Sequence, residues 1–518
     1  MNDVAAAGAA PRPLNRGMVT LSLMLATVMQ TLDSTIANVA LPHIQGNLSA
    51  AQDQVTWVLT SYIVATAIAT PLTGWLSERY SRKYVFMGSV AGFVLASIMC
   101  GLSTSLAQLV FARLLQGAFG AAIVPLSQAT LLDINPKEKQ GPALAMWGMG
   151  VMIGPILGPT LGGWLTENYN WRWVFFINVP IGTLALYGMW RYMRYVPGTQ
   201  RISFDVFGFA TLSLAVGALQ MLLDRGQQND WFSSLETWIE LGLFVLTAAY
   251  FIVHTALRPA GKSFFDYRLL LNRNYFTGVV VVFVIGIVLF TPRALIPSFL
   301  QNMLNYEVIT AGFLTAPTGF GTMIAMAIVG RLVGKVDFRI LLTSGFVITA
   351  FSLWQMSRYT LVIAQSDIVW PGIIQGIGIG LTFVPLSVAT FATLAPEMRA
   401  EGTAIYSLVR NLGNSMGISL MQTLLVRNTQ TMHASLAESV NYANPAFQDP
   451  AIATFYNPTT PAGLLALNAE ITRQAGMISY LNVFWLLCVM ALSIIPFLVL
   501  LSPVAKNAPA SVEHMAVD

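Results

Sequence analysis

Residues 30–38, with the sequence QTLDSTIAN, place a carboxylate in the middle of a long apolar stretch. This stretch runs from about residue 18 to residue 40, long enough for a helix to cross a bilayer, which takes roughly 20 residues. Asp33 is the only acidic residue well inside it. A charged side chain at the centre of a membrane helix costs on the order of 2.5–3.5 kcal/mol on insertion scales, so Asp33 is a functional candidate. The alternative is a carboxylate held structurally by a basic neighbour.

The composition indicates a polytopic helical membrane protein. The 518 residues are 55% hydrophobic and only 10% charged, whereas soluble domains carry about 25% charged residues. The net charge of +4 is dispersed over many loops and gives no indication of nucleic-acid binding. Cys100 and Cys488 lie in apolar runs, so no disulfide framework is indicated. Residues 1–17 lack the features of a signal peptide and are expected to be a cytoplasmic N-terminus.

Fourteen apolar runs recur along the chain, separated by polar breaks. They cover approximately residues 18–40, 55–76, 84–104, 106–131, 142–165, 173–193, 205–223, 236–256, 274–297, 307–331, 340–358, 369–393, 404–427 and 479–501. Most Lys and Arg residues between the runs fall on one set of loops, together with both termini. Because basic loops stay in the cytoplasm, both termini are predicted to be cytoplasmic.

An internal repeat divides the chain into two halves. Residues 116–130 (QGAFGAAIVPLSQAT) match residues 375–390 (QGIGIGLTFVPLSVAT) with one insertion, and each copy is followed by a proline, charges and a glycine. Both copies start from the same side of the membrane, so the repeats are parallel and related by an axis along the membrane normal. The glycines of 376–380 are interpreted as helix packing, because neither a preceding strand nor a Walker lysine accompanies them.

The predicted organisation follows from the runs and the repeat. An N-terminal six-helix half covers 18–193, a linker with two additional transmembrane helices covers 194–273, and a C-terminal six-helix half covers 274–501. A polar outer loop, 428–478, lies within the second half, and residues 502–518 form a cytoplasmic C-terminus. The expected fold class is therefore an all-α integral membrane protein.

Several motifs carry a family resemblance. They lie at residues 32–42 (LDSTIANVALP), 74–83 (GWLSERYSRK), 113–117 (RLLQG), 154–163 (GPILGPTLGG), 171–180 (WRWVFFINVP) and 222–232 (LLDRGQQNDWF). With them the chain resembles the fourteen-helix drug:proton antiporters of the major facilitator superfamily, close to the EmrB type. The resemblance implies a major facilitator fold, export of hydrophobic toxic compounds, and a proton gradient in place of a cofactor. Ser81 departs from the pattern, because the loop motif usually has glycine there.

Asp33 and Arg113 are predicted to form a pair that carries the proton. Asp33 lies about eight residues before Leu41 and Arg113 about seven residues after Leu106. At a rise of about 1.5 Å per residue, both lie on the order of 10–12 Å from their outer helix ends. Pairing would offset the cost of burying each charge. The protonation state of Asp33 then depends on burial and on Arg113, which act in opposite directions.

A second group of residues is predicted to act as a conformational latch on the cytoplasmic side. It consists of Gly74, Glu78, Arg79, Arg82, Lys83 and Asp133. Gly74 permits close helix approach, and the charges can form a cluster. The resemblance implies that this cluster latches the outward-facing state. The alternative is simple anchoring of the helix ends by positive charges.

The fifth apolar run is predicted to be a helix with one bare face. Its small residues and prolines are Gly150, Gly154, Pro155, Gly158, Pro159, Gly162 and Gly163. Four of the glycines follow at i, i+4 spacing, a pattern of close helix packing, and the prolines can bend the helix. A bare, bent helix suits a sliding interface between the halves. The resemblance identifies it as the antiporter motif, and the alternative is static packing.

The remaining site candidates are predicted to line a substrate cavity. They are Gln30, Asn38, Tyr62, Gln116, Arg293, Gln375 and Arg410. Arg293 lies near the outer end of its helix and has two possible roles. It contacts anionic substrates if it faces the cavity, or it snorkels to the membrane interface.

The resemblance also implies partners and a location. These are a periplasmic adaptor (an EmrA-type membrane fusion protein) and an outer-membrane channel (TolC type), in a bacterial inner membrane. The outer loop 428–478 is either a docking surface for the adaptor or a flexible surface loop. A carrier dedicated to one physiological substrate, such as a fatty acid or siderophore, is the main alternative. A membrane-embedded enzyme or sensor is disfavoured, because the sequence contains neither metal-ligand spacing nor a nucleophilic triad.

Overall fold

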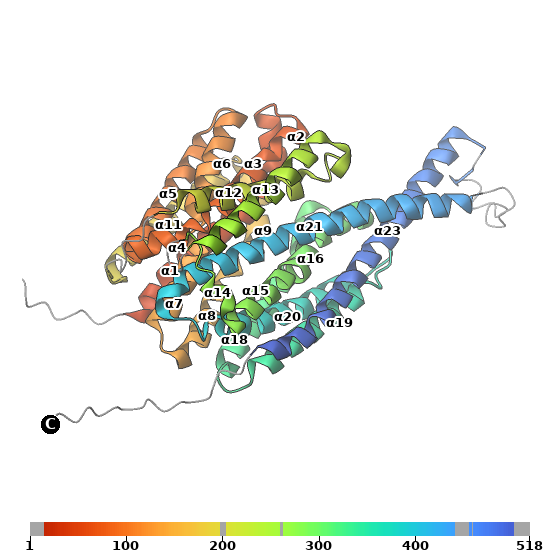
Figure 1. Cartoon of the computed structure of the whole chain (residues 1–518). Helices are drawn as coiled ribbons and strands as arrows, with labels where there is room; N and C mark the ends of the chain where they lie inside the picture. The colour runs from red at the N-terminus through yellow and green to blue at the C-terminus, as the bar shows by residue number, and fades with distance from the viewer. Residues whose placement is uncertain (1–14, 197–203, 259–262, 441–454, 458, 502–518) are drawn as a thin grey trace, which may run out of the picture.

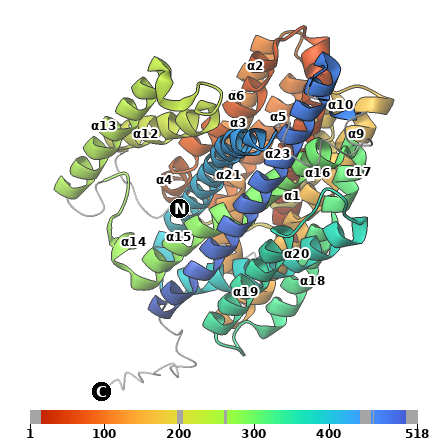
Figure 2. The same cartoon turned by 90° about the vertical axis from the view of Figure 1, so that its right-hand side faces the viewer.

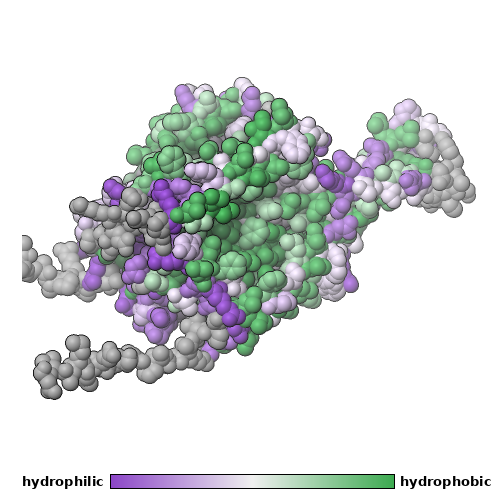
Figure 3. All heavy atoms as spheres, viewed as in Figure 1, coloured by the Kyte–Doolittle hydropathy of each residue, from purple (hydrophilic) through white to green (hydrophobic). Residues whose placement is uncertain are grey.

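The computed structural model describes residues 15–196, 204–258, 263–440, 455–457 and 459–501. Within these ranges the protein is helical and has no β-sheet; only an isolated bridge joins Val333 and Val336. The helices form an elongated bundle (Figure 1). In the view of Figure 3 hydrophobic side chains dominate its flank, and hydrophilic side chains gather toward its two ends. This distribution is what a bundle surrounded by lipid requires.

The N-terminal half contains six spans, four of which are broken into two helices. Its helices are α1 (Arg16–Asn47), α2 (Gln52–Val55), α3 (Trp57–Ala69), α4 (Leu72–Arg79), α5 (Arg82–Leu102), α6 (Leu106–Gly120), α7 (Ile123–Ile134), α8 (Lys137–Val151), α9 (Ile153–Asn168), α10 (Trp173–Phe176) and α11 (Asn178–Tyr192). The second span bends by 50° between α3 and α4, next to Pro71. Ser81 has φ −62° and ψ 127°, an extended conformation open to any residue, so the missing glycine causes no strain.

Two further helices lie between the halves in the sequence. They are α12 (Val206–Arg225) and α13 (Leu235–Leu257), followed by the short α14 (Arg268–Leu271). The pair stands on one flank of the bundle, with α13 outermost (Figure 2). Many apolar side chains of α13 are exposed, as expected for a helix that faces lipid on most sides.

The C-terminal half repeats the pattern of the first. Its helices are α15 (Arg273–Ile285), the π-turn η2 (Gly286–Phe290), α16 (Thr291–Leu304), α17 (Val308–Thr315), α18 (Pro317–Leu332), α19 (Phe338–Met356), α20 (Gln365–Phe391), α21 (Arg399–Glu438) and α23 (Pro461–Ser493). The π-turn lies just before Pro292, which cannot donate to the carbonyl of Val288. The glycines of 376–380 pack against α18 and α19, with Gly378 facing Thr349, so their interpretation as packing residues is confirmed.

The described helices agree with the fourteen predicted spans. Twelve described helical segments are long and apolar enough to cross a membrane, and the bent pair α3–α4 is a thirteenth. The fourteenth is α21, which has 40 residues and is more polar than the others. Two six-helix halves and two additional helices together make up the bundle.

The segment 428–478 differs from the predicted polar loop. Helix α21 continues to Glu438 and α23 begins at Pro461, so most of the segment is helical. The two helices run together beyond the rest of the bundle (Figure 1), and His433 contacts Asn468 Oδ1 at 3.0 Å. We call residues 428–438 with 461–478 the helical hairpin, and the end of the bundle that carries it the outer end. Residues 441–454 lie outside the described part of the chain.

Candidate functional site

A buried ion pair lies inside the N-terminal half, where α1 and α6 meet. Arg113 Nη1 donates to Asp33 Oδ2 at 2.7 Å, and the two side chains are 1% and 0% exposed. The pairing expected from their equal depth is therefore present. Removing one member of a buried pair leaves an uncompensated charge, which costs about 3–5 kcal/mol. Each side chain depends on the other to stay charged in this position.

Neutral donors complete the coordination of the carboxylate. Gln116 Nε2 donates to Asp33 Oδ1 at 2.8 Å and Asn178 Nδ2 donates to the same oxygen at 2.7 Å. Both amides also contact the hydroxyl of Ser97, at 2.7 and 3.2 Å. Asp33 thus accepts three hydrogen bonds from side chains. The sequence analysis missed Ser97 and Asn178, although Asn178 lies within the motif at 171–180.

Arg113 is fixed on every side. Its Nε donates to the carbonyl of Val58 at 3.0 Å, and Nη1 donates to Gln116 Oε1 at 2.6 Å. The guanidinium carbon lies 4.2 Å from the centre of the Tyr62 ring and 5.8 Å from that of Phe175. An arginine over an aromatic face gains electrostatic energy once water is removed. The network therefore connects α1, α3, α5, α6 and the α10–α11 span.

The glycine face of α8–α9 packs against α1, within the same half. A Cβ added at Gly154 would lie 2.4 Å from Thr31 Oγ1, and one added at Gly158 would lie 2.1 Å from Thr35 Oγ1. Gly150 and Gly162 meet α1 in the same way, but a Cβ at Gly163 would meet nothing within 4 Å. The predicted sliding interface between halves is thus wrong for this face. The glycine face instead packs against α1, the helix that carries Asp33.

Pro155 strengthens the same contact. Proline has no N–H, so the carbonyl of Val151 loses its helical donor. The Thr31 hydroxyl lies 3.3 Å from that carbonyl, and the Thr35 hydroxyl lies 3.2 Å from the carbonyl of Gly154. Both threonines are two residues from Asp33 along α1. The antiporter helix is therefore tied to the segment around the carboxylate.

The interface between the halves uses other side chains of α8 and α9. A Cβ at Gly312 would lie 3.7 Å from Pro159, and one at Gly319 would lie 2.1 Å from Ile156 Cγ1. Further along, the rings of Trp147 and Phe383 stack with centroids 6.4 Å apart. The proline side of α9, opposite its glycine face, thus faces the C-terminal half.

Residues of the predicted latch lie at the end of the bundle opposite the helical hairpin, and two of them contact the second half. Asp133 pairs with Arg82, and its other oxygen accepts a bond from Arg399 Nη1 at 2.8 Å. Arg399 begins α21, so this contact joins the two halves. Gly74 also faces α21, because its added Cβ would lie 2.9 Å from the Cα of Glu401. The charges that follow Pro396 in the second repeat were the sequence signal for Arg399.

The other latch candidates lie nearby with different contacts. Lys83 Nζ donates to the carbonyls of Trp190 and Met193 at 2.8 and 2.7 Å, which ties α5 to the end of α11. The Arg79 guanidinium lies over the Trp75 ring at 5.2 Å. Glu78 is half-buried near the end of α4. Asp133 bonds Arg399 and shares its carboxylate with Arg82.

The predicted cavity residues do not gather in one place. Tyr62 and Gln116 belong to the Asp33 network, where Gln116 is fully buried. Gln375 is buried in the C-terminal half, and neither its Oε1 nor its Nε2 has a partner among the described residues. Gln30 Oε1 is also buried without a partner. Asn38 is exposed and donates to the carbonyl of Ser34 at 3.3 Å.

Two arginines lie near the interface of the halves. Arg293 points toward the N-terminal half, with Nη2 3.7 Å from Met152 Sδ, so the structure does not support snorkelling. The Arg410 guanidinium lies 5.9 Å from the Phe383 ring centre. Arg410 belongs to α21, the helix that begins with Arg399. Both are half-buried. These positions suit contact with an anionic group between the halves.

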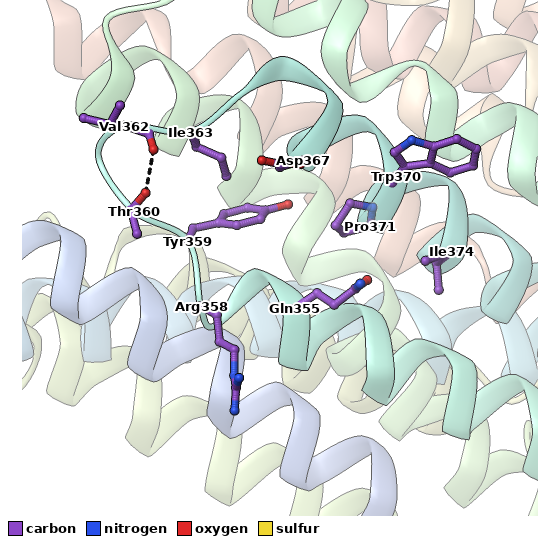
Figure 4. Close-up of a pocket in the computed structure, with 10 residues that line it drawn as sticks. All are labelled: Gln355, Arg358, Tyr359, Thr360, Val362, Ile363, Asp367, Trp370, Pro371 and Ile374. Atoms are coloured by element: carbon purple, nitrogen blue, oxygen red, sulfur yellow. Dashed lines mark hydrogen bonds between the residues drawn. The ribbon is translucent and has the colours of Figure 1, made fainter.

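A pocket of about 600 Å³ lies elsewhere, at the outer end of α19 and α20 (Figure 4). It is formed by residues from 355–363 and 367–374, none of which was predicted as a site residue. No group of three or more His, Cys, Asp or Glu residues able to hold a metal exists within the described ranges.

The chain is similar to known proteins over most of its length. A family model described as the Major Facilitator Superfamily matches residues 23–418. The multidrug export protein EmrB of Escherichia coli (strain K12) is 37% identical over 477 residues, covering 90% of this chain and 92% of that protein. The fatty acid resistance protein FarB of Neisseria gonorrhoeae is 35% identical over 490 residues, covering 94% and 96%.

Solved structures show the same fold at low sequence identity. The human organic anion transporter MFSD10 aligns with a TM-score of 0.58 and 13% identity, covering 92% of this chain and 99% of that one. A bacterial homolog of the human lysosomal transporter Spinster, in an inward-facing conformation, aligns with a TM-score of 0.53 and 17% identity, covering 95% and 98%.

Proposed function

The chain belongs to the major facilitator superfamily, and from this premise we propose that it is an antiporter that exports hydrophobic toxic compounds in exchange for protons. The compounds would be taken from the cytoplasm or the inner leaflet. The observation that carries the proposal is the buried Asp33–Arg113 pair, a titratable group at the centre of a membrane helix. The relatives named multidrug export proteins support the substrate class.

Asp33 is the proposed proton carrier, and Arg113 controls its charge. Ionised Asp33 accepts bonds from Arg113, Gln116 and Asn178. Oδ1 accepts two of these bonds and Oδ2 accepts one, so a proton can take the remaining acceptor site of Oδ2 and neutralise the carboxylate. Arg113 then loses its counter-charge in a dry environment, which favours a rearrangement that separates α1 from α6. Loss of the proton restores the pair.

The packing of α1 provides a route from this charge change to the rest of the molecule. The glycine face of α9 fits closely around Thr31 and Thr35, on both sides of Asp33. The opposite side of α9 meets α17 and α18 of the second half. A shift of α1 would therefore be passed to the interface of the halves. The latch of Arg82, Asp133 and Arg399 would hold the inner side closed until that shift occurs.

The helical hairpin is the proposed docking surface for a periplasmic adaptor of the membrane-fusion type, which would lead to an outer-membrane channel. Helices α21 and α23 extend together beyond the bundle (Figure 1). Leu464 and Leu465 are 49% and 72% exposed there. A second helical hairpin could cover such apolar residues. Deleting 432–470 should abolish co-purification of the adaptor while export in vesicles continues.

A carrier dedicated to one physiological substrate is the second candidate. A relative is named for fatty acid resistance, and Arg293 and Arg410 lie near the interface of the halves, where they could bind a carboxylate. Arg293→Gln should then impair export of weak acids more than export of cations. Equal effects on both classes would remove the assignment of Arg293 as a substrate contact.

Purified protein in proteoliposomes with an imposed pH gradient provides the test of this function. Several unrelated hydrophobic compounds should be transported, and each should dissipate the gradient. Transport of a single compound would favour the dedicated carrier. A transport rate that is the same with and without the pH gradient would contradict proton coupling.

A further inference from the structure

The pocket at the outer end of α19 and α20 contains buried polar atoms that lack partners. Tyr359 is 6% exposed, and its hydroxyl forms no hydrogen bond among the described residues. The same holds for Gln355 Oε1. A buried polar atom without a partner costs about 1–3 kcal/mol, so two in one pocket indicate a ligand that satisfies them.

The Tyr359 ring is held rigidly, which fixes where its hydroxyl points. It stacks on Phe299 with centroids 5.7 Å apart and meets the edge of Phe484 at 6.4 Å. Figure 4 shows the hydroxyl directed into the space beside Asp367 and Pro371. The aromatic contacts therefore present the hydroxyl to the pocket.

The acidic residue that lines the pocket, Asp367, is exposed. Asp367 lies in the first turn of α20 and lines the pocket. Burial and the Asp367 carboxylate together raise the pKa of Tyr359 above its usual value, so the tyrosine stays neutral. The one basic lining residue, Arg358, has its guanidinium over the Trp354 ring at 4.1 Å, and in Figure 4 it points away from Asp367.

The mouth of the pocket is apolar and exposed. Val362 is 93% exposed and Trp370 is 62% exposed. Tryptophan is enriched where a membrane helix meets the headgroup layer. A ligand entering there would meet these apolar side chains and the exposed Asp367 carboxylate, and the Tyr359 hydroxyl would be reached deeper in the pocket.

From this combination we infer that the pocket binds the ammonium group of an amphipathic organic cation. The ammonium lies between the Asp367 carboxylate, the Tyr359 hydroxyl and Gln355 Oε1, and the apolar part lies along Trp370 and Ile374. Two sources supply this chemistry: a phosphatidylethanolamine headgroup of the surrounding leaflet, or a cationic compound that the protein has exported. The site is separate from Asp33 and does not depend on the proposed proton exchange.

The inference is tested by measuring whether a ligand protects a cysteine at the mouth of the pocket from labelling by maleimide. The native cysteines, Cys100 and Cys488, are both buried, so Val362→Cys provides the reactive thiol. Dodecylammonium, whose primary ammonium can donate to the acceptors of the pocket, should slow maleimide labelling of this thiol at least about threefold in phosphatidylglycerol nanodiscs, which corresponds to an occupancy of roughly two thirds. Ala51→Cys, exposed at the outer end of the first half, is the matched thiol and should be unaffected.

Two variants in the Val362→Cys background identify the polar contacts. Asp367→Asn and Tyr359→Phe should each abolish the protection, whereas Asp230→Asn, an exposed acid between α12 and α13, should leave it intact. Protection that persists in Asp367→Asn, or equal slowing of Ala51→Cys, would overturn the site. Gel filtration and thermal unfolding identify any variant that has lost its fold.

Nanodisc composition distinguishes the two sources. If the lipid is the ligand, phosphatidylethanolamine alone slows labelling of Val362→Cys and the added cation changes little. If an exported compound is the ligand, labelling is equally fast in both lipids and slows only when the cation is added. Fast labelling under every condition would contradict the inference.

Discussion

The two halves carry the same Gln-Gly step, at 116–117 and 375–376, and surround the glutamine differently. Gln116 is buried, and its amide bonds Asp33, Ser97 and Arg113. Gln375 is equally buried, and neither end of its amide has a partner among the described residues. The repeat has thus preserved the position while changing its use.

The difference begins three residues earlier in each helix. The first half has Arg113 there and the second half has Gly372. The buried charge of Arg113 is paired with the Asp33 carboxylate. Gly372 has no side chain, so α20 can approach Thr318 closely. We propose that the first half holds the charge that changes during transport, and that the buried Gln375 amide of the second half contacts a substrate.

Removing Arg113 should break this asymmetry most severely. Arg113→Ala leaves Asp33 without its counter-charge, which should cost about 3–5 kcal/mol of stability and abolish export. Thermal unfolding in detergent and transport in vesicles measure the two effects. Arg410→Gln, which removes an arginine from the second half, should unfold at nearly the wild-type temperature. Equal destabilisation by both substitutions would contradict the assignment.

The glycine face of α9 should not tolerate an added side chain, whereas Gly163, which lies outside the contact with α1, should. Gly158→Ala places a Cβ 2.1 Å from Thr35 Oγ1 and should cost about 1–3 kcal/mol through overpacking, with most export lost. Gly163→Ala is the matched control, because its Cβ meets nothing within 4 Å. Export by Gly158→Ala at the rate of Gly163→Ala would show that the contact with α1 is unimportant.

Replacing Gln116 and Gln375 in turn compares the equivalent positions of the two halves directly. Gln116→Leu removes donors from Asp33 and should cost about 1–3 kcal/mol. Gln375→Leu removes an amide that has no partner, so stability should stay the same or rise, while the range of exported compounds should narrow. Thermal unfolding of both purified variants is the measurement. A larger loss of stability from Gln375→Leu would reverse the conclusion.

The smallest effect on stability is expected at the latch. The pair of Arg399 and Asp133 is partly exposed, and such pairs contribute about 0–1 kcal/mol. Arg399→Gln should therefore leave the melting temperature nearly unchanged and increase the labelling of cysteines on the inner side between the halves. Arg331→Gln, an exposed arginine of α18, is the control. Unchanged labelling would remove Arg399 from the latch.

The sequence predicted the fold and the charged pair because both follow from one-dimensional patterns. Apolar length predicts spans, the repeat predicts two halves, and equal depth predicts that Asp33 meets Arg113. The helical hairpin was missed because its helices are polar, and hydropathy detects only helices that contact lipid. Polarity alone does not distinguish a helix in water from a loop.

The rest of the site depends on which helix faces which, and the sequence does not contain that information directly. Glycine spacing showed a bare face on α9, but a bare face suits a neighbour in the same half as well as one in the other half. Ser97 is one serine among many in apolar runs, so nothing in the sequence distinguished it. Asn178 was recognisable as a polar residue in a quoted motif, yet its distance from Asp33 required the three-dimensional packing of α11 against α1 and α5.

Replacement of Asp33 tests the central claim most directly. Asp33→Asn keeps the size of the side chain and removes its charge, so the protein should insert and fold. In proteoliposomes it should lose all acceleration of export by an imposed pH gradient, while exchange of labelled for unlabelled compound without a gradient continues. Export by Asp33→Asn that responds to the pH gradient as the wild type does would contradict the assignment of Asp33 as the proton carrier.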